Sequence, residues 1–179
     1  MDHNAKNHYR KQHAHAYSIV RSLVIAGMLF LIDAFVLNQG VLATLICLGM
    51  VLIMLINTFR HRKDIEAHKK RLIIMGIYAT AAVLTIGAIS FNNRIAQQHA
   101  EIIIEACEQY KNQKGMFPAH LEDLVPAYLK QVPCAKYAFS NNRFIYLSRP
   151  NWHTLIYVAF PPFGRKIYNL ENRKWGQLD

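Results

Sequence analysis

The apolar residues are concentrated in the first half of the chain, and a more polar half follows. Three long apolar stretches cover residues 17–37, 41–59 and 72–91. Each is long enough to form the helix of roughly 20 residues that crosses the hydrocarbon core of a bilayer. The pattern predicts a transmembrane region over residues 17–91, preceded by a tail of residues 1–16. Residues 92–179 have the length of one small domain.

The third apolar stretch continues into an amphipathic sequence. No Gly or Pro lies between Ala88 and Asn112, which favours one uninterrupted helix. Lys111, Lys114 and Gly115 suit the C-terminal end of this helix. An apolar stripe with helical spacing predicts the face that packs on the rest of the domain; it consists of Ile95, His99, Ile102, Ile103, Ala106 and Tyr110.

The remaining residues predict a short helix and then a small sheet. Pro118 can open the helix, and Pro126 limits it to about two turns. Residues 137–140 and 144–147 predict a first hairpin that turns at 141–143, and residues 154–160 predict a central strand. Residues 164–169 and the stretch around Trp175 predict a last hairpin, turning at Glu171 and Asn172. The expected fold class is therefore α+β, with a long helix packed on an antiparallel sheet.

Charge predicts the orientation in the membrane. Residues 60–71, between the second and third stretches, contain six basic and two acidic residues, and the tail is also basic, whereas residues 38–40 are uncharged. Because short basic loops stay in the cytoplasm, we expect a cytoplasmic N-terminus and a periplasmic C-terminal domain in a bacterial inner membrane. The net charge of +10 is then explained by topology and lipid headgroups, and we expect no nucleic-acid partner.

Few polar side chains interrupt the apolar stretches. Asp33 lies near the outer end of the first stretch, where a structural role is expected. No series of ionisable groups marks a transporter or a proton pump. The third stretch carries small or β-branched residues on one helical face, which predicts close packing between helices in lipid; they are Gly76, Thr80, Val83 and Gly87.

Residues 72–179 resemble type IV pilin-like proteins and type II secretion pseudopilins. The resemblance rests on Tyr110, Gly115, the Phe117-Pro118 pair and the Leu-x-x-Leu run of 121–124, which follow the long helix. It implies a pilin-like domain over residues 92–179. Two apolar stretches precede the helix here, and Ile32 stands where the family has Glu when Gly27-Met28 is taken as the processing site. We therefore expect a displayed domain held in the membrane and no role as a filament subunit.

The side chains that could support chemistry do not form a recognisable set. Cys107 and Cys134 fall in the expected periplasmic domain, where either a disulfide or two free thiols are possible. The nine histidines show no metal-ligand spacing, and His120 and His153 have no evident acidic partner. We expect no metal, no cofactor and no catalytic residues. Trp152 and Phe163 flank the central strand and are candidates for a partner-binding face.

These observations favour a non-enzymatic accessory or assembly subunit of a membrane complex for secretion or pilus biogenesis. The expected partners are the lipid bilayer and other membrane-protein subunits. Two alternatives remain from the sequence. One is an accessory subunit of a membrane enzyme or transporter, and the other is a membrane-anchored ligand-binding or sensor domain.

Overall fold

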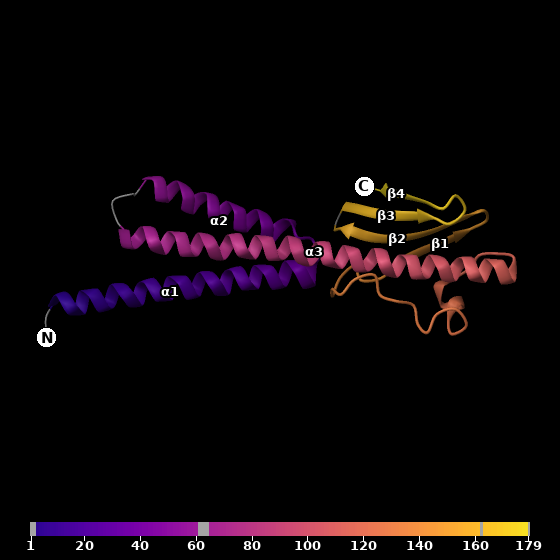
Figure 1. The fold of residues 1–179 in the computed structure, drawn as a ribbon, viewed down its shortest axis with the longest axis horizontal. Helices are drawn as coiled ribbons and strands as arrows, with labels where there is room; N and C mark the ends of the chain where they lie inside the picture. Colours follow the sequence, from indigo (N-terminus) through magenta and orange to yellow (C-terminus); the bar gives the residue numbers. More distant parts are fainter. Residues whose placement is uncertain (1–2, 61–64, 162, 179) are drawn as a thin grey trace. The chain divides into compact units, whose positions relative to one another are not determined.

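The structure, a computed structural model, describes residues 3–60, 65–161 and 163–178 (Figure 1). Three helices are long and apolar enough to cross a membrane: α1 (His3–Leu31), which continues as the π-helical turn η1 (Ile32–Leu37), α2 (Val41–Arg60) and α3 (Ile65–Lys114). The three predicted spans fall within them. Helix α1 extends back over most of the predicted tail, and residues 61–64 of the basic loop lie outside the described residues.

The chain forms two compact units. The first comprises Met1–Asp33 and Gly40–Gly87, and the second comprises Ala34–Gln39 and Ala88–Asp179. The boundary falls inside α3, close to the predicted junction between lipid-bound and amphipathic sequence.

Small side chains pack the first unit. Buried residues from all three helices form its cluster: Ala26, Cys47, Ile74, Tyr78, Ala81 and Ala82. The hydroxyl of Thr85 donates to the Ala81 carbonyl at 2.8 Å, so this buried polar group is satisfied within its own helix.

The second unit begins with the C-terminal half of α3, which ends as the sequence predicts. The Gly115 amide donates to the Lys111 carbonyl at 2.8 Å, and Gly115 has a φ of 79°, the left-handed conformation that closes many helices. The predicted two-turn helix after Pro118 is shorter than expected. It is a single 3₁₀ turn, η2 (Leu121–Leu124), whose Leu121 and Leu124 side chains are buried.

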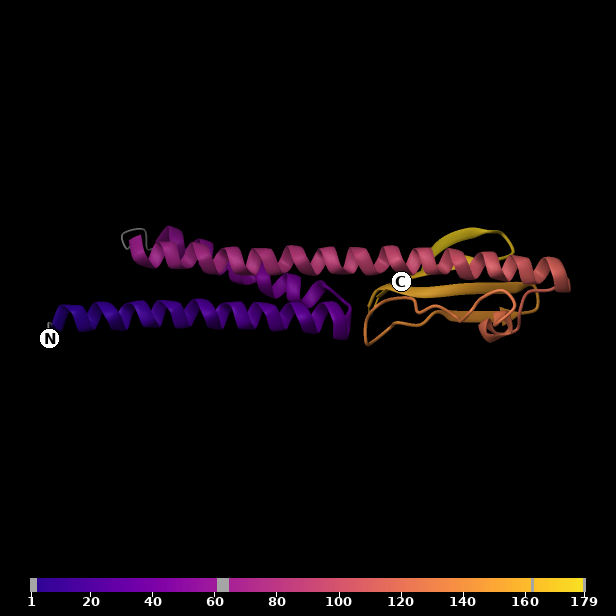
Figure 2. The same cartoon turned by 60° about the horizontal axis from the view of Figure 1, so that its bottom comes forward.

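Four antiparallel strands follow in the order β1-β2-β3-β4 (Figures 1 and 2). Their bounds are β1 Ile145–Arg149, β2 Trp152–Phe160, β3 Phe163–Asn169 and β4 Lys174–Leu178. The predicted last hairpin is confirmed, because Asn169 pairs with Lys174 across the turn at Glu171 and Asn172. The fold class is confirmed as α+β, with a 50-residue helix that packs against a small antiparallel sheet.

The predicted first hairpin is wrong. Residues 137–140 form no strand, and β1 pairs with β2 instead, with Ile145 opposite Ile156. The physical reason is that the backbone of this segment bonds elsewhere: the Phe139 amide donates to the carbonyl of Phe35 at 2.8 Å. A strand ladder would need that same donor.

The predicted helical stripe is rotated in the structure. The α3 residues that are buried in the core of the second unit are mostly alanines: Ala96, Ala100, Ile103, Ala106 and Cys107. Ile102, which was expected in the core, is 49% exposed. Small side chains let the helix approach the sheet closely, and Leu155 and Tyr157 of β2 fill the space opposite.

Candidate functional site

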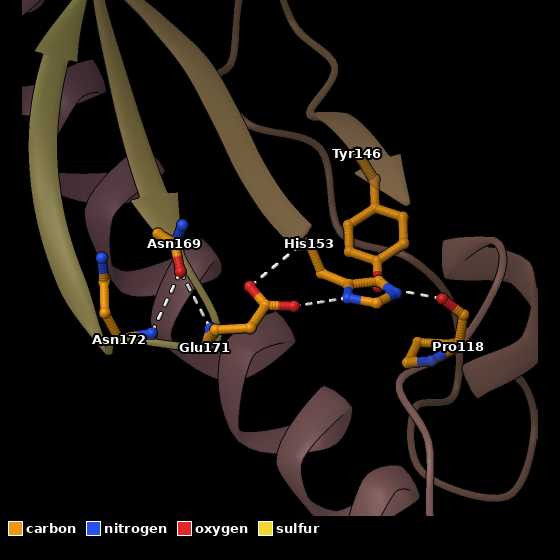
Figure 3. Close-up of polar contacts among 6 residues, drawn as sticks. All are labelled: Pro118, Tyr146, His153, Asn169, Glu171 and Asn172. Atoms are coloured by element: carbon orange, nitrogen blue, oxygen red, sulfur yellow. Dashed lines mark hydrogen bonds and ion pairs between the residues drawn. The ribbon is translucent and has the colours of Figure 1, made fainter. Parts of the chain in front are cut away.

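Among the described residues of the second unit, a histidine and a glutamate form a close ionisable pair (Figure 3). The Nδ1 of His153, at the start of β2, lies 2.6 Å from Oε1 of Glu171, in the turn after β3. The second carboxylate oxygen accepts the His153 backbone amide at 2.9 Å. No acidic partner of His153 was predicted from the sequence, because Glu171 is 18 positions away. The predicted hairpin turn at Glu171 and Asn172 could have indicated this pair. The strand before that turn pairs with the central strand, which begins near His153.

Two aromatic side chains lie against the His153 ring of this pair. The His153 ring lies 5.1 Å from the Phe117 ring and 6.4 Å from the Tyr146 ring, measured between centroids. The Tyr146 hydroxyl donates to the Pro118 carbonyl at 2.9 Å, as Figure 3 shows. Burial raises the pKa of Tyr146, so the phenol keeps its proton at neutral pH. The Tyr146 hydroxyl is therefore occupied as a donor and is not a ready base.

Opposing effects act on the Glu171 carboxyl. Burial raises its pKa, but hydrogen bonds from the backbone and ring of His153 outweigh burial, and the pKa is lowered overall. The carboxylate is thus ionised at neutral pH and bound on both oxygens. This arrangement fastens the β3–β4 turn to the start of β2.

A buried lysine is a second unusual group of the domain. Lys136 is 1% exposed, and its Nζ donates to the Ala159 carbonyl on β2 at 2.9 Å. Burial lowers the pKa of Lys136 to about 8. The ammonium joins the loop before β1 to the last part of β2.

Asp33 closes the turn between η1 and α2. Its two carboxylate oxygens accept the amides of Gly40 at 2.9 Å and Ala43 at 2.6 Å. The first amides of a helix lack partners within the helix, and a carboxylate also matches the positive end of the helix dipole. Asp33 therefore has the structural role that the sequence predicted.

Of the two possibilities for Cys107 and Cys134, the structure shows free thiols and no disulfide. Cys107 and Cys134 are both free, with Cys107 buried and Cys134 exposed. The Cys134 carbonyl accepts Nδ1 of His99 at 2.6 Å, and His99 precedes Cys107 by eight residues, or about 12 Å along the helix. A disulfide needs Cα atoms about 4–7 Å apart. Burial raises the pKa of the Cys107 thiol to about 12, with a smaller contribution from Glu108, so this thiol is unreactive.

The predicted helix-packing face of α3 lies on the outside of the first unit. Gly76, Thr80, Val83 and Gly87 are all exposed. Gly76 and Thr80 line a groove of about 410 Å³ between α1 and α3, whose α1 wall includes Gly27 and Phe30. The helices of this chain pack on another face of α3, around Tyr78 and Ala82. Packing of the predicted face against a partner stays a prediction.

The structure does not bring the two predicted partner-binding residues together. Trp152 opens β2, whereas Phe163 pairs with Phe160 at the other end of that strand. Eight residues separate these ends, or about 27 Å. Arg149 lies over the Trp152 ring at 5.5 Å. The Phe163 side chain lies outside the described residues.

Among the residues that the structure describes, no three His, Cys, Asp or Glu side chains are grouped as a metal site would require. The chain matches no protein-family model, no curated protein and no solved structure. Its three span-length apolar helices and its four-stranded sheet are those of a multi-span membrane protein with a small C-terminal β domain.

Proposed function

We propose that this chain is a non-enzymatic inner-membrane protein that displays a pilin-like domain in the periplasm. In this proposal it is an accessory or assembly subunit of a larger membrane complex for secretion or pilus biogenesis. One observation carries the proposal: a single helix, α3, has a first part apolar enough to span the membrane and a second part that packs on a four-stranded sheet.

The environment of the reactive groups supports a role without catalysis. His153 is engaged by Glu171, the Lys136 amine is buried on a carbonyl, and the Cys107 thiol is buried in the core. A nucleophile and a base must reach both each other and a substrate. Each of these three groups is instead engaged in contacts within the domain.

The exposed face of α3 supports a role as a subunit. A Cβ built on Gly76 or Gly87 meets nothing within 4 Å, so both positions are open toward the surroundings of this chain. Small residues on an outward helix face let a second transmembrane helix approach closely. A partner subunit with its own spans fits this face.

Crosslinking in native membranes, followed by purification in a mild detergent, tests the proposed partners. Secretion or pilus components should remain attached. The variants Gly76→Leu and Gly87→Leu should release them, because a larger side chain blocks the close approach of a partner helix at positions where an added Cβ meets nothing within 4 Å. Gly49→Leu is the control, since its Cβ also meets nothing within 4 Å but it lies on α2. Recovery of an unrelated enzyme alone would overturn the assignment.

Thiol labelling tests the proposed orientation. Cys134 is exposed, whereas Cys47 and Cys107 are buried. A membrane-impermeant maleimide should label Cys134 in spheroplasts, and Cys134→Ser should abolish the labelling. Asn172→Cys in the Cys134→Ser background should restore the labelling, because Asn172 is exposed in the turn between β3 and β4. Labelling that requires lysis would show that the domain faces the cytoplasm.

A further inference from the structure

Contacts along α3 define two ends of the second unit. Near its start, Gln97 accepts the hydroxyl of Tyr157, in the second half of β2, at 3.0 Å, and just past its end the Phe117 ring lies 5.1 Å from the ring of His153, at the start of β2. Strand β2 therefore runs back along the helix, and its last residue, Phe160, lies toward the end where α3 enters the domain. Figure 1 shows the arrowhead of β2 at that end. The apolar stretch of α3 finishes at Phe91, close to the same end.

The loop before β1 reaches the same end of the domain. Lys136 bonds to the Ala159 carbonyl, one residue before Phe160. The Phe139 amide donates to the Phe35 carbonyl, and Ser140 Oγ donates to the Val36 carbonyl at 2.5 Å. Phe35 and Val36 are among the last residues of the candidate span His13–Leu37. The loop is thus fastened to the point where that span ends.

Large aromatic side chains are exposed at this end. Phe139 is 83% exposed, Tyr137 63% and Phe160 52%. Burying an exposed Phe side chain is worth about 1.5–3 kcal/mol, so leaving two of them in water is unfavourable. Arg94, one turn after Phe91, and Arg165, which pairs with Val158 near the end of β2, are also exposed. Aromatic rings combined with basic side chains are typical of the boundary between acyl chains and headgroups.

We propose that this end of the domain docks on the phospholipid interface. Phe139 and Phe160 enter the boundary of the acyl chains, Tyr137 lies at headgroup level, and Arg94 and Arg165 bind headgroup phosphates. The occupant is lipid because the loop is continuous, through Phe35 and Val36, with a segment that itself qualifies as a membrane span. This inference depends on the spans and is independent of the proposed role in secretion or pilus assembly.

Tryptophan fluorescence of the full chain in phospholipid vesicles tests the docking. Phe139→Trp places a reporter in the loop, and Met116→Trp is the matched control, because Met116 is 68% exposed and follows the far end of α3. The emission of each variant in excess of the parent chain is measured in vesicles with and without brominated acyl chains. Phe139→Trp should be blue-shifted and should lose most of its excess emission to the brominated lipid. Met116→Trp should show neither effect.

Two outcomes are decisive. If Phe139→Trp emits like Met116→Trp and is not quenched, the docking surface faces water or a missing protein partner, and the proposal is overturned. If Phe139→Trp fails to fold, judged by loss of the near-UV circular dichroism of the parent, Phe160→Trp provides the same readout from the sheet. Quenching of Phe160→Trp supports the proposal, and its absence overturns it.

Discussion

The Oγ of Ser140 lies 2.5 Å from the carbonyl oxygen of Val36, a residue 104 positions earlier. The neighbouring Phe139 amide bonds to Phe35 in the same way. The last carbonyls of a helix have no partner within the helix. A loop of the C-terminal domain supplies the donors at the end of η1. The carbonyls at the end of the first apolar segment are therefore satisfied by residues more than 100 positions later in the sequence.

Ser140→Ala should destabilise the protein by about 1 kcal/mol, because the Val36 carbonyl loses its hydroxyl donor. Thermal unfolding in detergent micelles measures the change. Ser148→Ala is the control, since Ser148 is exposed on β1 and should tolerate the change. Equal melting temperatures for Ser140→Ala and the parent would contradict the capping role.

The rotated stripe of α3 can be tested with two adjacent isoleucines. Ile103 is fully buried against the sheet, whereas Ile102 is 49% exposed. Ile103→Ala should cost about 2–5 kcal/mol through lost burial and a cavity, and Ile102→Ala should cost well under half of that. The two melting temperatures give the comparison. Equal costs would instead favour the face that the sequence pattern predicted, because that face includes both isoleucines.

Because of Lys136, the free energy of unfolding should increase as the pH rises from about 8 to 10.5. Burial lowers the pKa of Lys136 from 10.5 to about 8, so between these values the unfolded chain binds more protons than the folded one. Stability must then rise with pH across this window, by at most about 3 kcal/mol, and the full penalty is present below pH 8. The stability of Lys136→Met relative to the parent should therefore be highest near pH 7 and fall toward pH 10. The exposed Lys130→Met should show no such trend.

Glu171→Gln should weaken the attachment between β2 and the β3–β4 turn. The pKa of Glu171 is lowered below 4.5 in the folded state, so the stabilisation is complete above pH 4.5 and is lost as the pH falls through the lowered value. We expect a loss of about 1 kcal/mol at pH 7, a modest value because the carboxylate is partly exposed. Denaturation curves of the variant and the parent should converge in acid. Glu122→Gln, at an exposed carboxylate, should match the parent throughout.

The sequence pattern correctly predicted the elements whose backbone hydrogen bonds join residues close together in the sequence. The continuity of α3, its end at Gly115 and the hairpin around Glu171 follow from spacing, the absence of breakers and turn residues. The rotation of the buried face of α3 was not predictable in the same way. Ala96 and Ala100 are less apolar than Ile102, but their small size suits the close approach of a sheet whose position the sequence does not specify.

The remaining differences come from bonds between distant residues. Residues 137–140 have the composition of a strand, yet their donors reach η1, and no pattern within the segment reveals that partner. The burial of Lys136 depends on a carbonyl 23 positions away. The His153–Glu171 pair depends on the register that places Thr154 opposite Asn169.

The contacts of the turn between η1 and α2 can form only in a certain order as the chain is synthesised. Asp33 can bond to Gly40 and Ala43 as soon as those residues have been made. The Val36 carbonyl can accept from Ser140 only after 104 more residues have been made. At ordinary rates of translation this takes about 5–20 seconds. During that interval the Val36 carbonyl lacks its Ser140 donor. Folding of the C-terminal domain then supplies this donor. The contacts at the end of η1 are therefore completed only after the helices on both sides of the turn have been synthesised.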